Sequence, residues 1–174
     1  EDSQAAGRWE TAQGGEYFAA GVGGAITGRG ADLLIIDDPH SEQDALNLTA
    51  LERAYEWYTS GPRQRLQPGG QIVCVMTRWN VKDLTGMLMQ HQKEAKADQW
   101  ELVEFPAIMP SGKPVWPEYW NLGELQTVKA SLSLGKWNAQ WMQNPTSEEG
   151  AIIKREWWKK WEHDFMPKLE HIIQ

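Results

Sequence analysis

Residues 33–40 read Leu-Leu-Ile-Ile-Asp-Asp-Pro-His, and this stretch decides how the rest of the chain is interpreted. Four apolar residues without alternation are typical of a strand buried on both faces, as in a parallel sheet. Pro39 has no backbone donor and disfavours further strand. Asp37 and Asp38 are therefore expected at the carboxyl end of the strand, which is the edge at which open α/β sheets bind ligands.

The two adjacent carboxylates have the pattern of a Walker B strand. In that pattern one acid serves the magnesium ion of a bound nucleotide, and the next orients or activates the attacking water. Successive side chains of a strand point to opposite faces, so Asp38 must lie past the strand end if both acids face one site. The alternative is a strand end that carries two turn-forming aspartates.

Length and composition are those of a globular domain and exclude several classes of function. A chain of 174 residues is long enough for one domain with a substantial core. Its net charge of −7 is concentrated in the first third, and no basic stripe predicts an extended nucleic-acid footprint.

The single cysteine, Cys74, lies in an apolar run and is expected to be a small buried hydrophobe. No stretch is long enough to span a membrane, and no signal peptide is visible. Because the first residue is not Met, we expect a piece of a longer protein.

The pattern along the chain alternates strands with helices, which predicts an α/β fold with a mostly parallel sheet. Ser41 is expected to cap a helix, with Asp44 in its first turn. Most of the 11 tryptophans are expected in packing. Strands are predicted as two short pieces within 14–28, then 33–36, 71–76 and 100–105, with a possible last one from 171. Helices are predicted over 42–60, 82–94 and 121–143 (two, separated near Gly135), with an amphipathic stretch over 154–163. Turns or loops are predicted at 68–70, 106–118 and 143–147.

A second polar group follows the second buried strand. Thr77, Arg78 and Asn80 come directly after it, and neighbouring parallel strands end at the same edge of a sheet. Side chains there are placed to sense a γ-phosphate or to transmit its loss to the next helix. The alternatives are that Thr77 and Asn80 cap the helix that follows, and that Arg78 is an ion-pair partner.

A phosphate-binding loop is missing from the sequence. Such a loop reads Gly-x-x-x-x-Gly-Lys followed by Ser or Thr, and neither Gly-Lys pair, at 112–113 and 135–136, fits. If the chain belongs to a nucleotide motor, its loop is expected upstream, and this chain alone should bind ATP weakly or not at all. Arg29 stands between two glycines before the acidic strand. It is either a solvent-exposed turn residue or an arginine that stabilises a transferring phosphoryl group in a neighbouring subunit.

Taken in order, these segments resemble the large terminase subunit of tailed bacteriophages, the ATP-driven genome-packaging motor. The resemblance covers roughly residues 14–174, and the ordered set of motifs is more specific than any one of them. The segments that carry it are Tyr-Phe-Ala-Ala-Gly at 17–21, Thr-Gly-Arg-Gly-Ala-Asp at 27–32, residues 33–40, Val-Met-Thr-Arg-Trp at 75–79 and Trp-Met-Gln-Asn-Pro at 141–145.

This resemblance implies a P-loop NTPase-like (ASCE) sheet that is incomplete at its N-terminus. Residues 1–143 would be the C-terminal part of the packaging ATPase domain. Residues 144–174 would be the linker and the approach to an RNase H-like nuclease, whose own site lies beyond this chain. The chain on its own is expected to be inactive, while the full-length protein would be an ATPase and an endonuclease.

The resemblance also implies roles for five residues. Asp37 matches the Walker B aspartate that holds Mg²⁺ through water. Asp38 matches the catalytic carboxylate, which is usually glutamate, so the shorter side chain is a departure from the pattern. Arg29 matches the arginine proposed to act in trans, and Thr77 and Arg78 match the coupling motif.

The cofactors implied by the resemblance are ATP and Mg²⁺. The implied partners are double-stranded viral DNA, the portal protein, the small terminase subunit and further copies of the same chain in a ring. The implied location is the cytoplasm of the bacterial host.

Two other interpretations remain open. In the first, residues 37–40 resemble the Asp-Glu-x-His box of a helicase core, with His40 in the histidine position. Against it, the next strand ends in Thr-Arg-Trp where a Ser-Ala-Thr-like segment is expected. In the second, the chain is a non-catalytic, tryptophan-rich binding module, in which the two aspartates are turn residues.

Overall fold

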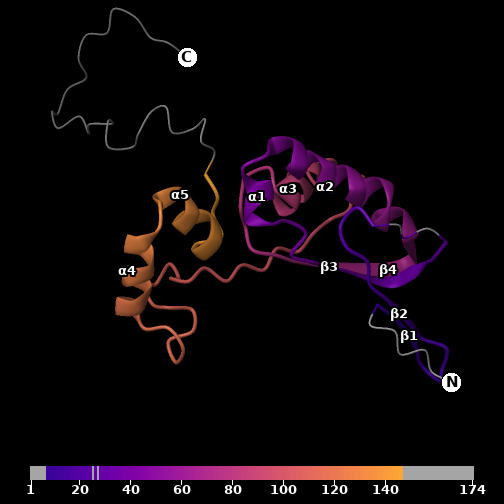
Figure 1. Cartoon of the computed structure of the whole chain (residues 1–174), viewed down its shortest axis with the longest axis horizontal. Helices are drawn as coiled ribbons and strands as arrows, with labels where there is room; N and C mark the ends of the chain where they lie inside the picture. The colour runs from indigo at the N-terminus through magenta and orange to yellow at the C-terminus, as the bar shows by residue number, and fades with distance from the viewer. Residues whose placement is uncertain (1–6, 25, 27, 147–174) are drawn as a thin grey trace, which may run out of the picture.

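The computed structural model describes residues 7–24, 26 and 28–146. Within these ranges the fold is mixed α/β, with a small parallel sheet flanked by helices (Figure 1). A separate N-terminal hairpin and a C-terminal helical region lie on either side of this central part. The expected amphipathic stretch at 154–163 and the strand expected from 171 lie outside the described residues.

The sheet consists of two parallel strands, β3 (Ala31–Asp37) and β4 (Leu66–Val75). The partners run in register from Leu33 opposite Gln71 to Asp37 opposite Val75, which confirms the parallel arrangement predicted from the two apolar runs. The expected turn at 68–70 lies inside β4, where the register shifts. A side chain at Gly70 would come within 3.0 Å of the Asp32 carbonyl oxygen, so only glycine fits this irregular stretch.

Helices cover one face of the sheet. They are α1 (Glu42–Ala45), α2 (Leu48–Ser60) and α3 (Leu84–His91), with the short 3₁₀ turn η1 (Pro62–Arg65) leading into β4 (Figure 1). Ser41 caps α1 in a capping box with Asp44, as predicted. The single helix predicted over 42–60 is interrupted, because Asn47 accepts hydrogen bonds from the backbone amides of Thr49 and Ala50 and starts a new helix.

The core lies between this helical layer and the sheet. Its buried centre consists of Ile36, Tyr58, Leu84 and Leu88. Cys74 is partly buried and packs against the centre, as a small hydrophobe would, and burial raises the pKa of its thiol to about 11.

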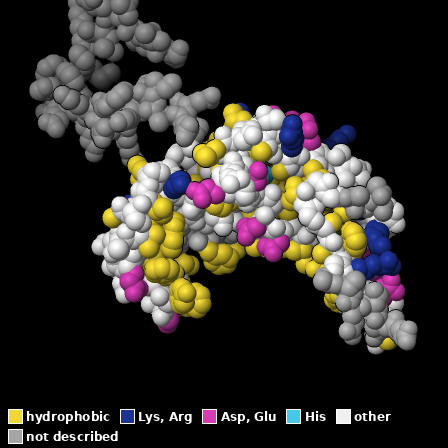
Figure 2. Space-filling view, viewed as in Figure 1, with side chains coloured by type: hydrophobic (Ala, Val, Ile, Leu, Met, Phe, Trp, Pro, Cys, Tyr) yellow, Lys and Arg dark blue, Asp and Glu magenta, His cyan; other side chains and the backbone are white. Residues whose placement is uncertain are grey.

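The opposite face of the sheet is open. Four apolar side chains on it, Leu33, Ile35, Val73 and Val75, are each between 45% and 60% exposed. Figure 2 shows hydrophobic side chains gathered on the side of the sheet away from the helices. The expectation that the strand at 33–36 is buried on both faces is therefore wrong for the part of the chain that the structure describes.

The N-terminal hairpin pairs β1 (Arg8–Glu10) with β2 (Glu16–Phe18) in antiparallel register. The prediction of two short strands within 14–28 is thus wrong in position, because one strand precedes the first glycine pair instead of following it. Trp9 stacks on Tyr17 across the pair, with ring centroids 5.2 Å apart.

Residues 100–105 form no strand, although their alternation predicted one. Leu102, Val103 and Phe105 are between 47% and 69% exposed, so no described surface buries the apolar side of this segment. A strand needs a partner for its backbone groups and a surface for its side chains, and neither is present here among residues 7–146 as described. The irregular loop predicted at 106–118 is confirmed, apart from one isolated bridge between Ile108 and Pro114.

The C-terminal helical region contains α4 (Leu122–Ser131), α5 (Leu134–Lys136) and the π-helix η2 (Trp137–Trp141). The break falls at 132–133 and not at Gly135, because the Ser133 hydroxyl caps the next helix by accepting from the Lys136 amide. Trp137 is buried and stacks on Trp141 with centroids 5.7 Å apart, so these two rings serve packing as predicted.

Candidate functional site

Asp37 and Asp38 lie where β3 ends, on an exposed turn. Asp37 is the last strand residue, and the Asp38 amide still donates to the Val75 carbonyl over 2.9 Å. Asp38 then turns the chain in the left-handed region at φ 41°, which aspartate tolerates better than most residues. The second acid therefore lies past the strand end, as the alternation rule required.

The structure brings Thr77 to the same edge of the sheet as the two acids. Its backbone amide donates to Oδ1 of Asp38 over 3.1 Å, so the carboxylate bridges the ends of the two parallel strands. This contact occupies one oxygen of Asp38, whose side chain is otherwise exposed to solvent. The arrangement joins the acidic turn to the polar segment that follows β4, which the sequence predicted from the shared direction of the strands.

Arg78 is turned away from the acids and held in an ion pair with Asp83. Its Nε lies 3.0 Å from Oδ2 of Asp83, and the side chains of Arg78 and Asp83 are 14% and 0% exposed. The sequence left open whether Arg78 senses a phosphate or forms an ion pair, and the structure shows it in an ion pair.

Asp83 organises the segment between β4 and α3. Its carboxylate accepts hydrogen bonds from the backbone amides of Trp79, Asn80 and Gly86 at 2.9 to 3.2 Å. It is also the N-cap of α3, so the alternative that Thr77 and Asn80 cap this helix is wrong. Sequence reasoning missed Asp83, although an aspartate directly before a short apolar run is a known helix-start signal.

His40 is the buried last residue of the acidic turn, residues 37–40. It is 6% exposed, and its Nε2 accepts a hydrogen bond from the backbone amide of Leu84 over 2.8 Å. Burial lowers the pKa of the imidazole, against smaller opposing effects of Asp83 and Asp44, so the ring is neutral at pH 7. The sequence singled out His40 only as a helicase-like histidine and gave no reason to expect this contact.

Arg29 lies at the other end of β3, separated from Asp37 by Gly30 and the first six residues of the strand. It forms an ion pair with Glu16 of β2, and its guanidinium lies 4.6 Å from the centroid of the Phe18 ring. It lines a shallow polar hollow together with Gln64, Arg65 and Gln67. The structure therefore does not bring Arg29 together with Asp37 and Asp38 in one chain. The neighbouring Thr27 lies outside the described residues.

No preformed metal site is found among the described residues, since no three of their His, Cys, Asp or Glu side chains cluster as ligands. Asp37 offers one exposed carboxylate. Magnesium binds proteins through one or two carboxylates and completes its shell with water and substrate phosphates. The donor set at this turn fits that mode and does not fit an all-protein cage.

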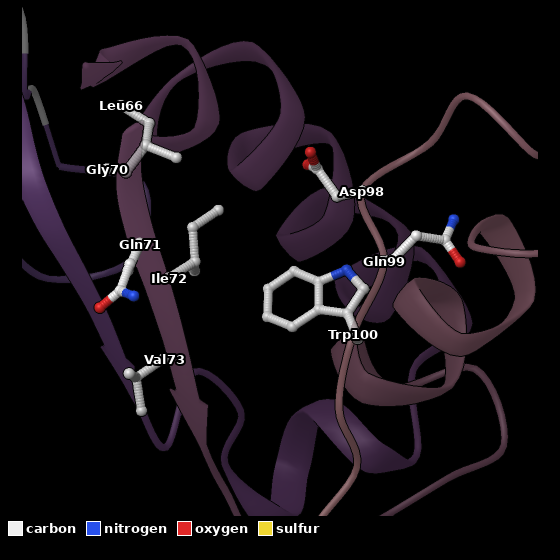
Figure 3. Close-up of a pocket in the computed structure, with 8 residues that line it drawn as sticks. All are labelled: Leu66, Gly70, Gln71, Ile72, Val73, Asp98, Gln99 and Trp100. Atoms are coloured by element: carbon white, nitrogen blue, oxygen red, sulfur yellow. The ribbon is translucent and has the colours of Figure 1, made fainter. Parts of the chain in front are cut away.

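A separate hollow lies between β4 and the segment 98–100 (Figure 3). Trp100 projects into it, and Ile72 and Val73 line the strand side. Its one acid, Asp98, is paired with Arg63 over 2.8 Å. Without a free reactive group, this hollow has no feature that links it to the acids at the strand end.

No protein-family model and no curated protein matches the chain. Within the ranges that the structure describes, no helix combines the length and apolar character needed to cross a membrane.

Proposed function

We propose that the chain is part of an ATP-hydrolysing DNA-packaging motor, the terminase large subunit of a tailed bacteriophage. The observation that supports this most directly is the bridge from Asp38 to the Thr77 amide. It links the two acids to the segment after the next parallel strand at the edge where α/β proteins place their ligands. A P-loop NTPase-like sheet, completed by a phosphate-binding loop upstream, is part of this proposal.

The proposed roles follow from the positions of the side chains. Asp37 would hold Mg²⁺ through water, and the ion would neutralise charge on the phosphates of ATP. The free carboxylate oxygen of Asp38 would orient the attacking water. Thr77, tied to Asp38 through its amide, would report changes at the phosphates, and Arg78 would support it through the ion pair with Asp83.

Arg29 is proposed to act on the site of a neighbouring copy. Its position at the opposite end of β3 from Asp37 suits a residue that serves another subunit better than its own. An arginine supplied in trans contributes on the order of 10³- to 10⁵-fold to turnover in related phosphoryl-transfer enzymes. A ring of copies is therefore part of the proposal, together with viral DNA, the portal protein and the small terminase subunit, in the host cytoplasm. Residues 144–174 would lead to the nuclease.

The second candidate is a tryptophan-rich binding module. The observation in its favour is the stacked pair Trp116 and Tyr119, with centroids 4.9 Å apart and 58% and 65% exposed. Trp137, in contrast, is 2% exposed and belongs to the core of its region. Two exposed rings form a smaller ligand-binding surface than 11 tryptophans in the sequence would allow.

The main test measures ATP hydrolysis by the chain extended with its upstream coding sequence, with and without DNA. We expect DNA-stimulated turnover that Asp37→Ala abolishes. Asp32→Ala is the matched control, because Asp32 is an exposed acid of the same strand at its other end and should leave turnover unchanged. Normal turnover in Asp37→Ala would remove the Walker B assignment.

A mixing experiment tests Arg29. Arg29→Ala and Asp38→Ala subunits are each expected to be inactive as uniform rings. Mixed rings should regain part of the activity, because some interfaces then pair an intact arginine with an intact acid. No recovery in rings shown to be mixed would contradict action between subunits.

A further inference from the structure

Two hydrogen bonds connect the acidic turn, residues 37–40, with the coupling segment, residues 77–84. In each one a side chain of the acidic turn accepts from a backbone amide of the coupling segment. Asp38 binds the first residue of the segment, Thr77, over 3.1 Å, and His40 binds the last, Leu84, over 2.8 Å. The coupling segment is thus held at both ends by the same short turn.

The contact of His40 is specific in its chemistry. The Leu84 amide belongs to the first residue of α3, where helix amides have no partner within the helix. To accept from it, Nε2 must carry no proton, so the neutral ring must be protonated at Nδ1. That Nδ1 is buried and has no hydrogen-bond partner in the part of the chain that the structure describes. A buried donor without a partner costs free energy. The ring nevertheless keeps the orientation in which Nε2 accepts from the Leu84 amide and Nδ1 is left without a partner.

Between its two ends the coupling segment is held together by Asp83. Asp83 binds the side chain of Arg78 and the amides of Trp79 and Asn80, and it caps α3 at Gly86. Gly86 is packed so closely that an added Cβ would lie 2.0 Å from the Val81 carbonyl oxygen. A segment packed this tightly has little room to absorb a displacement of the acidic turn.

We propose that His40 is a positioning residue that couples the acidic turn to α3. The coupling serves the proposed ATPase, on which this role rests: a shift of the turn on nucleotide exchange reaches α3 through the His40–Leu84 hydrogen bond. Since Leu84 and Leu88 of α3 belong to the core that covers the sheet, α3 is the element through which the site moves the rest of the domain.

The first test is spectroscopic and uses the 174-residue chain. Two-bond ¹H–¹⁵N spectra of the imidazoles at pH 7.5 should show His40 as the neutral tautomer protonated at Nδ1. His91, which is exposed and stacks on Tyr55, is the internal control and should show the tautomer mixture of a solvated ring. A His40 ring protonated at Nε2 would overturn the proposal, because that nitrogen could not accept from Leu84.

The second test measures amide exchange at Leu84 in two variants of His40. His40→Leu keeps apolar volume and removes the acceptor, and should speed exchange at Leu84 about fivefold to tenfold. His40→Gln can place an oxygen near the position of Nε2 and should restore most of the protection. If both variants fold and exchange alike, His40 acts through packing and the proposal fails.

The third test asks whether the turn and α3 are coupled. Asp38→Ala removes the acceptor of the Thr77 amide and should also speed exchange at Leu84, by about twofold or more. In the His40→Leu background, Asp38→Ala should still speed amide exchange at Thr77 but should no longer affect exchange at Leu84. An Asp38→Ala effect confined to Thr77 in the wild-type background would overturn the coupling, and this measurement stands even where His40→Leu does not fold.

These results separate the coupling from the proposed activity. Amide exchange and the His40 tautomer are measured without nucleotide. If they show the coupling between the acidic turn and α3 but the extended chain has no ATPase activity, only the proposed function is contradicted. An active ATPase whose turnover falls equally in His40→Leu and His40→Gln would sink the coupling alone.

Discussion

The two faces of the β3–β4 sheet carry similar apolar side chains, but one face is buried under helices and the other is exposed to solvent. Ile36 points to the helices and is 4% exposed, while its neighbour Ile35 points away and is 60% exposed. The same holds along β4, where Ile72 and Cys74 pack against the core and Val73 and Val75 do not. Hydrophobicity alone did not decide which side is buried. The connection through α1, α2 and η1 did, because it places all of its helices on one face.

This contrast also separates the structural part of the site from its open part. On the covered side His40 and Asp83 are buried: His40 binds the Leu84 amide of α3, and Asp83 pairs with the half-buried Arg78. At the edge, Asp37 and Asp38 remain exposed. The buried groups fix the geometry of this edge, and the two acids remain accessible from solvent.

The largest expected effect is on the covered side, at the Arg78–Asp83 pair. Asp83→Ala should lower the free energy of unfolding by about 3–5 kcal/mol, because it leaves a buried guanidinium without its partner and α3 without its cap. Asp98→Ala, which breaks the exposed pair with Arg63, should cost no more than about 1 kcal/mol. Urea denaturation of both variants measures the difference. Equal costs would mean that the Arg78–Asp83 pair is not buried in solution.

The next effect compares the two faces directly at adjacent isoleucines. Ile36→Ala should destabilise the fold by about 2–5 kcal/mol, since it opens a cavity in the core. Ile35→Ala, one residue earlier on the open face, should stay within about 0.5 kcal/mol. Thermal unfolding followed by circular dichroism distinguishes them. A large loss in Ile35→Ala would show that something covers the open face.

The smallest effect is a pH dependence of stability from His40. Its pKa lies below the ordinary value of 6.5 in the folded chain, so the unfolded chain binds the proton first as the pH falls. Stability should therefore decline as the pH drops below about 6.5 and level off once the folded ring is protonated too. Asp44 faces the ring, and hydrogen bonds from Ser41 lower the pKa of its carboxyl below 3.8, so it titrates in a separate, more acidic window.

The comparison for this prediction is His40→Gln, which has no titrating group at that position. The difference between the denaturation midpoints of the two proteins should be constant near pH 8 and should change toward pH 5, because only the wild-type protein loses stability through the titration of His40. A parallel pH dependence in the two proteins would assign it to another group.

Local rules predicted several features correctly because nearby residues decide them. The capping box at Ser41 and Asp44 depends on side chains three residues apart. The parallel pairing of β3 with β4 follows from two apolar runs joined by a helical connection. The turn at Asp37 and Asp38 follows from Pro39. In these cases the preference of the chain and the final fold agree.

The failure at 100–105 occurs where a partner distant in sequence is needed. The strand predicted at 100–105 has the right alternation, but Phe105 is 69% exposed and no described strand pairs with it. The helix over 42–60 is split by the competing cap at Asn47, and the hairpin is shifted toward the N-terminus. At 100–105 the propensity was read correctly and the surroundings overrode it, whereas the cap at Asn47 is a local signal.

The sequence by itself determined that two acids end an apolar strand and that a polar segment ends the next one, because both patterns are local. Only the tertiary structure decided how the two meet. It paired the Thr77 amide with Asp38 and the Leu84 amide with His40, since these contacts join residues from separate turns whose distance is fixed by the packing of α3 on the sheet. It also left one face of that sheet open, which no count of apolar residues along a strand can reveal.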